Sequence, residues 1–390
     1  MKPLSYDSLK SQLSLHRSVV GLIIIGLIVI LAIGISTAGA QVFIRQYNVT
    51  DIGALPAKKA AVCVPAAIND QGQVTGASGM VNVDESAFLY RQNAGKDMME
   101  DLGRNYTGTS HGLAINAVGD VVGDVTFFDK GAVRHAALFR NGKIADLGTL
   151  KGDVFSRATG INASGQVVGF SSTGLDETAI QHAFIWSTAT GMQEIPTLGG
   201  ASTQAFGINN LGSVTGTSEL SQSGRFPTTH AFIYLQYPVV RMIDLGTLGG
   251  NESYGMAINL NNHVVGYSTF PNRSDRIHAF LYDGIKMHDL GSLDNTMTGN
   301  DQSYALGVNM ADDVVGYTFI QAIAGSEHPT RQTAFIYRMG EMTNLNDLIT
   351  PEAAKQYWLR AAVAINNMGQ IVAIAEDLNT YETRAVLLTH

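Results

Sequence analysis

Four histidines recur at the same position of a repeated phrase, and a metal site is the first chemistry that such a recurrence suggests. Metal ligands must converge at about 2 Å from the ion. Each histidine begins the same strand of a different repeat, so an array of repeats would hold them apart. We therefore predict no metal and no other cofactor, and a structural role for His135, His182, His230 and His278. We expect them to form hydrogen bonds with neighbouring residues of the set Asp146, Asp244, Asp289, Ser156, Ser253 and Ser303.

Acidic residues in the loops are the second possible source of chemistry. Hydrolysis of a glycosidic bond needs two carboxyl groups that converge on the substrate. The loops contain Asp84, Glu85, Asp176, Glu177, Glu219, Asp275, Glu327, Glu376 and Asp377, but their spacing does not predict that any two meet. A Gly-x-Ser-x-Gly nucleophile motif is absent, and the glycine pairs at 199–200 and 249–250 carry no lysine for a phosphate. No catalytic residue is predicted.

The strands that carry these residues belong to one repeated unit. The phrase Ile-Asn-x-x-Gly-x-Val-Val-Gly, clearest at residues 161–169, returns seven times. Its asparagine falls at Asn69, Asn116, Asn162, Asn209, Asn259, Asn309 and Asn366, spaced by 47, 46, 47, 50, 50 and 57 residues. A period in this range indicates an array of one supersecondary unit. Asn and Gly at the ends of a four-residue segment favour a type I turn. Where the Gly is missing, Asn262 and Asp312 replace it, and these types tolerate the left-handed region best.

Each unit has the pattern of four short antiparallel strands. In the third unit they lie at 158–161, 166–170, 182–186 and 192–195. The third strand is apolar on both faces, which is typical of a sheet covered on both sides. Seven such sheets around an axis form a propeller. We therefore predict an all-β fold, a seven-bladed β-propeller of four-stranded antiparallel blades. A linear solenoid is the main alternative.

The two ends of the array hold complementary parts of one unit. Residues 47–53 resemble a fourth strand with no first three, and residues 384–390 resemble a third strand with no fourth. We predict that the strand near residues 43–52 pairs with residues 384–389 and closes the C-terminal blade. Removing residues 41–53 would then leave that blade open.

The first forty residues have the pattern of a targeting segment. Val19–Ile35 is an apolar run without charge that follows a basic stretch, and it predicts one N-terminal hydrophobic helix. Small residues before Ala40-Gln41 suit a cleavage site, but a run of this length also spans a bilayer. We predict that residues 1–40 are a signal peptide or a single membrane anchor and that residues 41–390 are the propeller domain. Either way the domain is extracytoplasmic: secreted or periplasmic, or anchored to the inner membrane.

Charge and cysteine content exclude two classes of protein. The formal net charge is −8, and no basic footprint for nucleic acid is present. Cys63 is the only cysteine, which excludes an intrachain disulfide, and its apolar neighbours predict a buried, inert thiol.

The phrase His-Ala-Phe followed by an apolar and an aromatic residue carries a family resemblance. It occurs at residues 182–186, 230–234 and 278–282, with the companion Asp-Leu-Gly-Thr-Leu-Gly-Gly at 244–250. With these phrases the chain resembles the HAF-repeat family of bacterial extracellular repeat proteins over about residues 43–390. The resemblance implies export and a propeller-like fold. It brings no established enzymatic activity and no catalytic residues.

Loop length varies on one side of the predicted propeller. The Asn-x-x-Gly turns are constant, whereas insertions follow the Val-Val-Gly and Asp-Leu-Gly strands, whose connections share one rim. Variation gathered on one face is how repeat arrays usually build a binding surface, although tolerated drift in loop length is the alternative. Candidate contacts on this rim are Phe127, Phe128, Arg225, Phe226, Arg273, Arg276, His328, Arg331, Tyr357 and Tyr381.

We predict an extracytoplasmic binding or scaffold protein that presents this face to a surface protein or a glycan. The alternative is a secreted hydrolase that acts on glycans at the central channel.

Overall fold

The computed structural model describes residues 46–56, 62–80, 84–93, 96–104, 108–128, 131–175, 179–221, 228–271, 273–294, 301–321 and 330–390. Residues 45–390 form one compact unit. The predicted N-terminal helix and the predicted cleavage position lie outside the described residues. No helix within the described ranges is long and apolar enough to cross a membrane.

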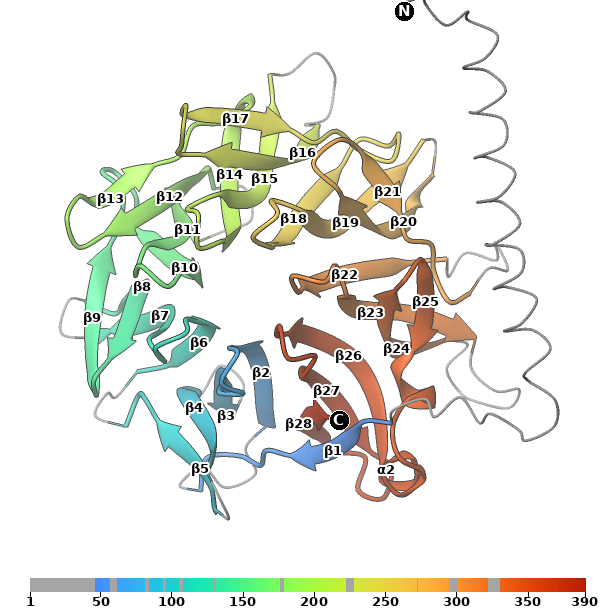
Figure 1. Ribbon diagram of the computed structural model, residues 1–390. Coiled ribbons are helices and arrows are strands. Elements are labelled where there is room, and N and C mark those ends of the chain that lie inside the picture. Colours follow the sequence, from blue (N-terminus) through green and yellow to red (C-terminus); the bar gives the residue numbers. More distant parts are fainter. Residues whose placement is uncertain are drawn as a thin grey trace, which may run out of the picture. The chain divides into compact units, whose positions relative to one another are not determined.

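The described strands form seven four-stranded antiparallel sheets around a common axis, so the predicted β-propeller fold is confirmed (Figure 1). Blade 1 contains β2 (Val62–Ile68), β3 (Val74–Gly79), β4 (Ser86–Asn93) and β5 (Lys96–Asp101). Blade 2 contains β6 (Ser110–Ile115), β7 (Val121–Phe127), β8 (Val133–Arg140) and β9 (Lys143–Gly148). Blade 3 contains β10 (Phe155–Ile161), β11 (Val167–Ser172), β12 (Gln181–Ser187) and β13 (Gly191–Glu194).

Blades 4 to 7 repeat the same order from the axis outward. Blade 4 contains β14 (Gly199–Ile208), β15 (Val214–Leu220), β16 (Thr229–Leu235) and β17 (Arg241–Asp244). Blade 5 contains β18 (Ser253–Ile258), β19 (Val264–Phe270), β20 (Arg273–Tyr282) and β21 (Met287–Asp289). Blade 6 contains β22 (Ser303–Val308), β23 (Val314–Gln321), β24 (Thr330–Arg338) and β25 (Glu341–Asn344). The short helices η2 (Leu345–Asp347) and α2 (Pro351–Gln356) lead to blade 7, which contains β26 (Tyr357–Ile365), β27 (Ile371–Asp377) and β28 (Thr383–Thr389).

The fourth position of blade 7 is occupied by β1 (Asn48–Asp51), which pairs antiparallel with β28. Asp51 pairs with Val386 in the register that Asp244 and Phe232 adopt in blade 4. The Gly53 amide donates to Asp51 Oδ1 at 2.8 Å, the same distance as from Gly246 to Asp244. The segment after β1 then reaches blade 1, where the Leu55 amide donates to Ser78 Oγ. Residues 48–55 therefore make the same contacts as the fourth strand of another blade.

The last position of the repeated phrase requires glycine for a steric reason. In blades 1 to 6 the register of the innermost strand shifts opposite or next to this glycine, and a backbone carbonyl of that strand approaches the glycine. A Cβ atom on Gly169 would lie 1.9 Å from the Arg157 carbonyl oxygen, and one on Gly266 would lie 1.7 Å from that of Tyr254. No larger residue fits there without a shift of the backbone. The cores lie between blades, where the phenylalanines of the third strands, such as Phe184 and Phe280, are fully buried.

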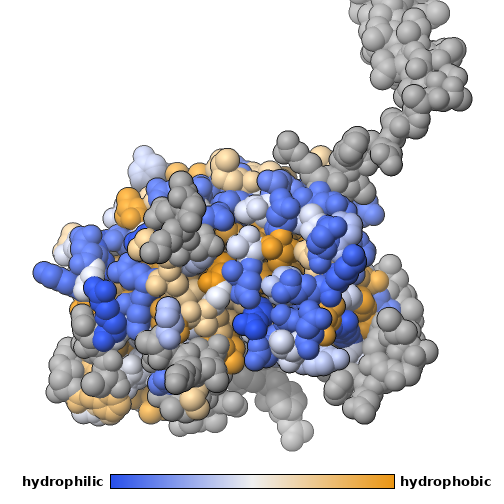
Figure 2. Space-filling model, turned by 90° about the horizontal axis from the view of Figure 1, so that it is seen from below, coloured by the Kyte–Doolittle hydropathy of each residue, from blue (hydrophilic) through white to orange (hydrophobic). Residues whose placement is uncertain are grey.

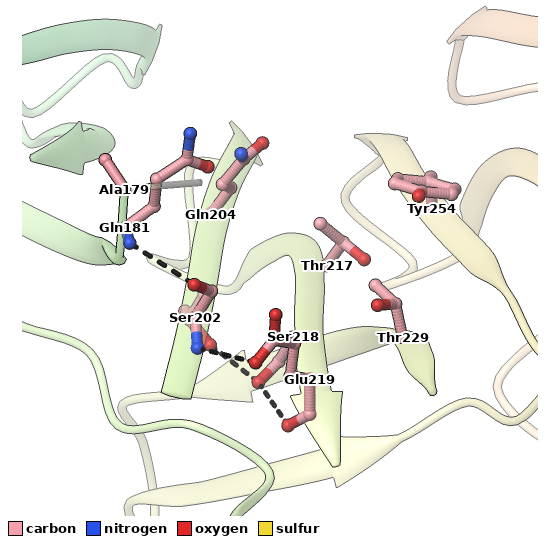
Figure 3. Close-up of a pocket in the computed structure, with 10 residues that line it drawn as sticks. Ala179, Gln181, Ser202, Gln204, Thr217, Ser218, Glu219, Thr229 and Tyr254 are labelled. Carbon is pink, nitrogen blue, oxygen red and sulfur yellow. Dashed lines mark hydrogen bonds between the residues drawn. The ribbon is translucent and has the colours of Figure 1, made fainter. Parts of the chain in front are cut away.

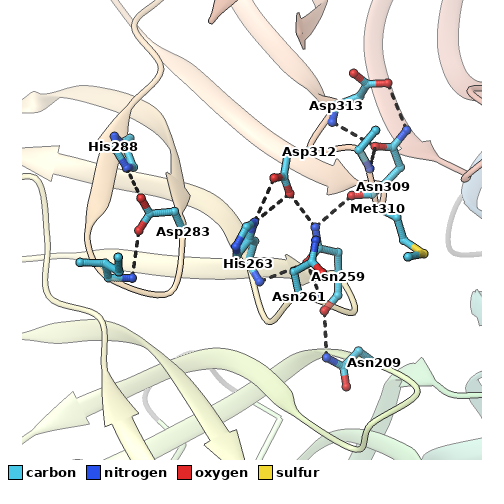
Figure 4. A network of polar contacts seen from close by, with 12 residues as sticks. Asn209, Asn259, Asn261, His263, Asp283, His288, Asn309, Met310, Asp312 and Asp313 are labelled. Atoms are coloured by element: carbon cyan, nitrogen blue, oxygen red, sulfur yellow. Dashed lines mark hydrogen bonds and ion pairs between the residues drawn. The ribbon is translucent and has the colours of Figure 1, made fainter. Parts of the chain in front are cut away.

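The repeated asparagines form a closed belt at one end of the channel. Each Nδ2 donates to the backbone carbonyl of the equivalent asparagine in the next blade, from Asn69 through Asn309 to Asn366. Asn366 then donates to the Asn69 carbonyl at 2.9 Å, which completes the ring. Each Oδ1 also accepts the backbone amides two and four residues later in its own turn. Figure 4 shows the belt between Asn209 and Asn309.

The residues predicted to replace glycine in these turns have the expected conformation. Asn262 and Asp312 have φ angles of 59° and 60°. Both also join neighbouring blades: Asn262 Oδ1 accepts from Asn209, and Asp312 Oδ1 accepts from Asn259 and lies 2.9 Å from His263 Nδ1 (Figure 4). The loss of glycine here therefore adds a contact between blades.

Candidate functional site

The two rims of the propeller differ as the strand order requires. One rim holds the asparagine belt and the short hairpins between third and fourth strands. The other holds the connections of variable length, including α2, where Thr350 caps the helix and Pro351 is its first residue. Figure 2 views the molecule from the side, where the described surface is a mixture of polar and apolar groups. A candidate site is therefore sought on the variable rim.

The repeated histidines are held by carboxylates. Nδ1 of His135 lies 3.1 Å from Asp146. Nδ1 of His230 lies 2.7 Å from Asp244, and Nδ1 of His278 lies 2.7 Å from Asp289. His182 instead contacts Asp153, because the third repeat has Glu194 at the equivalent position.

The serines named with these histidines have a separate role. Ser156, Ser253 and Ser303 accept the backbone amide that follows the histidine and donate to the glycine carbonyl of the Asp-Leu-Gly phrase. Within the described ranges, no group of three or more His, Cys, Asp and Glu residues is arranged to hold a metal ion.

His278 has the most enclosed of these contacts. Its side chain is 2% exposed, and its two ring nitrogens lie 2.7 Å from Asp289 and 2.9 Å from Asp301. Arg276 Nε lies 2.8 Å from the other Asp301 oxygen, and Ser292 donates to Asp301. Burial alone would lower the pKa of His278, but the hydrogen bonds and charges of the two carboxylates outweigh it and raise that pKa. The fold therefore favours the protonated imidazolium.

We expect His278→Gln to destabilise the protein more at acidic than at alkaline pH. A raised folded-state pKa contributes stability that is fully present below the ordinary histidine value and lost as pH rises through the folded-state pKa. The loss in free energy of unfolding should be about 1.5–3 kcal/mol at pH near 5.5 and smaller at pH near 9. Urea unfolding of both proteins at the two pH values measures it. An equal difference at both would contradict the argument.

The candidate contacts on the variable rim occupy different environments. Phe127 and Tyr357 are 2% and 8% exposed and pack in cores, so we correct their assignment to the open surface. Phe128 and Tyr381 are exposed. Arg276 covers the Phe270 ring, and Arg331 lies 3.9 Å from the Trp358 ring centroid. Arg273 begins β20, and Arg225, Phe226 and His328 lie outside the described residues. A binding role for the exposed members stays a prediction.

The variable rim holds a pocket, and among the described residues no two acidic loop residues face each other in it; Asp176, Glu177 and Glu327 lie outside the described residues. Glu219 is the one carboxylate among the described residues that line it. Its Oε2 accepts the backbone amides of Ala201 and Ser202 at 3.1 and 3.2 Å.

This pocket lies on the variable rim and is lined by residues of blades 3, 4 and 5 (Figure 3). Its volume is about 360 Å³. Hydroxyl and amide groups dominate the lining, which consists of Ala179, Gln181, Ser202, Thr203, Gln204, Thr217, Ser218, Glu219, Thr229 and Tyr254. Figure 3 shows the two glutamines on one side of the pocket and Tyr254 on the other. Tyr254 is the one aromatic residue of the lining.

The pocket lies where blade 4 has a smaller side chain than blades 3, 5 and 6 at one position of the repeat, although blades 1 and 2 have Ala77 and Asp124 there. The residue after the last glycine of the phrase is Tyr267 in blade 5 and Tyr317 in blade 6. The Tyr267 ring fills the space toward the next inner strand, at 4.8 Å from Tyr254 and 5.0 Å from Tyr304. In blade 4 the same position is Thr217, which pairs with Gln204. The space that a tyrosine ring would fill in blade 4 is therefore left open. One face of the Tyr254 ring borders this space, and Tyr267 covers the other face.

Sequence reasoning missed Gln204, Thr217 and Tyr254 because it searched the loops for variation. The signal was present inside the repeat. Five residues before the repeated asparagine stand Val64, His111, Arg157, Gln204, Tyr254, Tyr304 and Ala361. The surrounding positions keep one residue type or a small set, whereas this one changes charge, size and polarity from blade to blade.

The Cys63 thiol is buried at the position that serine holds in the inner strands of blades 2, 3, 5 and 6. Burial raises its pKa to about 12. It is therefore not a nucleophile.

Residues 199–385, just under half of the chain, match the family model described as "Protein of unknown function (DUF3466)". This is not the HAF-repeat family, so the family assignment made from the repeated phrases was wrong. The reason is physical: the Ala and Phe of the phrase are buried between blades and its His bonds to an Asp, so blade packing alone accounts for it. No curated protein matches the chain.

Two solved structures resemble the chain at low sequence identity. The β-propeller domain of the Trilobed protease from Pyrococcus furiosus, described as having an open velcro topology, matches with a TM-score of 0.50 and 12% identity, over 84% of this chain and 95% of that one. TolB from Acinetobacter baumannii matches with a TM-score of 0.41 and 9% identity, over 82% of this chain and 64% of that one. The first likeness shows that the chain has a β-propeller fold, and it shows the fold alone.

Proposed function

We propose that this protein is an extracytoplasmic binding protein whose variable rim recognises a glycan in the pocket bordered by Tyr254. One observation carries the proposal: a cavity of about 360 Å³ that joins a single aromatic ring to a lining of hydroxyl, amide and carboxylate groups. Small-ligand pockets have volumes of this order. A sugar ring presents hydroxyl groups at its edge and C–H groups on its face, so both kinds of lining find a partner.

The geometry around Tyr254 supports a stacked ligand. One face of its ring is covered by Tyr267 at an interplanar angle of 21°. A sugar ring on the other face would continue this stack into blade 4, in the space that Thr217 leaves open. Gln204 and Glu219 would then meet the hydroxyl groups of the sugar.

We expect Thr217→Tyr to abolish glycan binding and leave the fold intact. The new ring would fill the pocket as Tyr267 and Tyr317 fill the equivalent space in blades 5 and 6. The full chain and the variant should be compared on an immobilised glycan panel, with affinity for the best ligand falling about a hundredfold or more and the melting temperature unchanged.

A matched control for the aromatic contact is Tyr237→Ala. Tyr237 is 82% exposed and lies in a hairpin on the opposite rim. Tyr254→Ala should weaken glycan binding, and Tyr237→Ala should not. A glycan that bound equally well to Thr217→Tyr would refute the proposed site, and capture of protein partners only would refute the ligand class.

We further propose that residues 1–40 direct export, and that β1 closes the propeller by completing blade 7. The sequence pattern supports export, and mass spectrometry of the mature N-terminus tests it. The register that β1 shares with other fourth strands supports closure.

A further inference from the structure

A cluster of charged residues surrounds one buried carboxylate at the variable-rim end of blade 2. Asp124 is fully buried in β7. Its Oδ1 lies 2.8 Å from His111 Nδ1 and accepts from Arg134 Nε at 2.7 Å, and its Oδ2 accepts from Arg157 Nε at 2.7 Å. The other nitrogen of His111 lies 3.2 Å from Glu85. The five residues come from blades 1, 2 and 3.

The charges of this cluster do not balance at Asp124. Burial alone would raise the pKa of this carboxyl, but the hydrogen bond from His111 and the two arginines outweigh burial and lower it to about 2. Asp124 is therefore one negative charge between two permanent positive charges. Glu85 offsets His111, whose own pKa is raised by its bond to Asp124 despite the opposing effect of burial. With His111 protonated, one positive charge remains in excess, and with His111 neutral the two carboxylates balance the two arginines.

Two other described arginines, Arg338 and Arg140, are each matched with one aspartate. Arg338 places both Nε and Nη2 on the two oxygens of Asp313, at 2.8 and 2.9 Å. Arg140 is matched with Asp120 at 2.8 Å. Arg157, by contrast, uses only Nε on Asp124, and its Nη atoms have no hydrogen-bond partner among the described residues, although its guanidinium lies 5.9 Å from the Phe155 ring centroid. Its side chain is 34% exposed, and that of Arg134 is 31% exposed. A buried anchor therefore holds two guanidinium groups at the surface.

The position of the cluster links it to the pocket. His111 and Arg157 stand five residues before the repeated asparagine, where Gln204 and Tyr254 stand in the next two blades. The inner strands of blades 3 and 4 are joined directly by a hydrogen bond from Thr159 Oγ1 to the Ala205 carbonyl at 2.7 Å. Arg157 in β10 is thus the counterpart, one blade away, of a residue in the pocket wall.

We propose that Arg134 and Arg157 form a site for an oxyanion, such as a carboxylate or sulfate group carried by an acidic glycan. Guanidinium groups bind oxyanions with paired, charge-assisted hydrogen bonds, which suits the two Nη atoms of Arg157. Arg134 Nη2 already lies 2.7 Å from Asp124 Oδ1 and 2.8 Å from His111 Nδ1, so Arg134 contributes its charge and its remaining Nη atom. The site itself follows from the cluster alone, whereas the placement of the anion on a glycan rests on the proposed function. The ligand would stack at Tyr254 and extend its acidic group toward blade 3.

The site is tested first with inorganic sulfate. Sulfate stabilises most proteins by exclusion from their surface, so a rise in melting temperature would not be specific. The full chain should instead be titrated with sodium sulfate at constant ionic strength while the His111 ring signals are followed by NMR. We expect a saturable shift, with affinity lowered about tenfold or more in Arg157→Gln and unchanged in the control Arg140→Gln. Arg157→Lys keeps the positive charge but loses the paired donors of the guanidinium, so its sulfate affinity should lie between those of the unmodified chain and Arg157→Gln. The proposal would be overturned if the shift of the His111 signals did not saturate. It would also be overturned if Arg157→Gln and Arg140→Gln changed the sulfate affinity to the same extent.

The second arm identifies the source of the anion. Tetragalacturonate and the neutral galactotetraose should be compared on the full chain, and the acidic probe should bind about tenfold more tightly or better. This preference should vanish in Arg157→Gln, and Thr217→Tyr should abolish binding of both. If the unmodified chain bound both probes at Tyr254 with equal affinity, the acidic glycan alone would be refuted. Saturable sulfate binding with no glycan binding would instead refute the proposed function and leave the anion site standing.

Discussion

A chain that begins at residue 54 is expected to lose most of its stability relative to one that begins at residue 45. The shorter chain lacks β1 and with it Tyr47 and Ile52, which are 1% and 6% exposed in the cores on the two sides of blade 7, and it frees Leu55 at its new end. Burying one large apolar side chain contributes about 1.5–3 kcal/mol, so the three together account for roughly 5–9 kcal/mol. The whole stability of a domain is typically about 5–15 kcal/mol.

Thermal unfolding followed by circular dichroism measures this loss, and the chain from residue 45 is the matched control. The shortened chain also leaves β28 as an open edge, so we expect it to aggregate at concentrations where the control stays monomeric. Equal melting temperatures of the two chains would show that β1 is dispensable and would refute closure by this strand.

A rescue separates the need for the strand from the need for its place in the sequence. Asn48 pairs with Thr389, one residue before the end of the chain. Antiparallel strands can be joined by a two-residue turn. A copy of residues 47–55 attached after His390 through an Asn-Gly turn, which places Tyr47 opposite His390, should therefore restore the melting temperature of the shortened chain. The same copy with Ile52→Asp should not, because it would place a charge in the core.

The repeats made the fold readable from the sequence, and they also explain what could not be read. Seven asparagines at near-constant spacing predict seven blades because each one satisfies the same turn and the same bond to the next blade. The phrase at residues 47–53 predicts a fourth strand for the same reason. The pocket depends instead on a single small residue, Thr217, at a position where blades 5 and 6 have tyrosine. Only the packing of Tyr267 between two rings shows that this difference leaves a cavity.

Burial of individual loop residues was the least predictable feature. Phe127 follows the pattern of an exposed aromatic on the variable rim, yet it packs in the core between blades 1 and 2. Likewise, Arg157 carries no signal of a site on its own. Its meaning comes from Asp124, which is 33 residues away and belongs to another blade.

Asn162→Ala is expected to cost roughly 3 kcal/mol of the free energy of unfolding. Asn162 is 2% exposed, its Oδ1 accepts the amides of Ser164 and Gln166, and its Nδ2 donates to the Asn209 carbonyl. The alanine leaves the amides of Ser164 and Gln166 without their partner and removes one of the two hydrogen bonds of the Asn209 carbonyl, which Gly212 still donates to. A buried polar group without a partner costs about 1–3 kcal/mol. The comparison variant Asn210→Ala removes only the exposed hydrogen bond that Asn210 Oδ1 accepts from the Ala163 amide, so it should cost less, about 0.5–1.5 kcal/mol. Urea unfolding measures both.

The asparagine belt and β1 both join blade 7 to blade 1, where the propeller closes. Asn366 donates to the Asn69 carbonyl on one rim, and Leu55 donates to Ser78 on the other, so both join blade 7 to blade 1. If both stabilise the same junction between blades 7 and 1, Asn366→Ala should lower the free energy of unfolding less in the chain from residue 54 than in the chain from residue 45. The reason is that the junction is already open in the chain that lacks β1. Asn162→Ala, at a junction that β1 does not touch, should cost the same in both. Additive losses for Asn366→Ala would mean that the belt closes the ring independently of the strand.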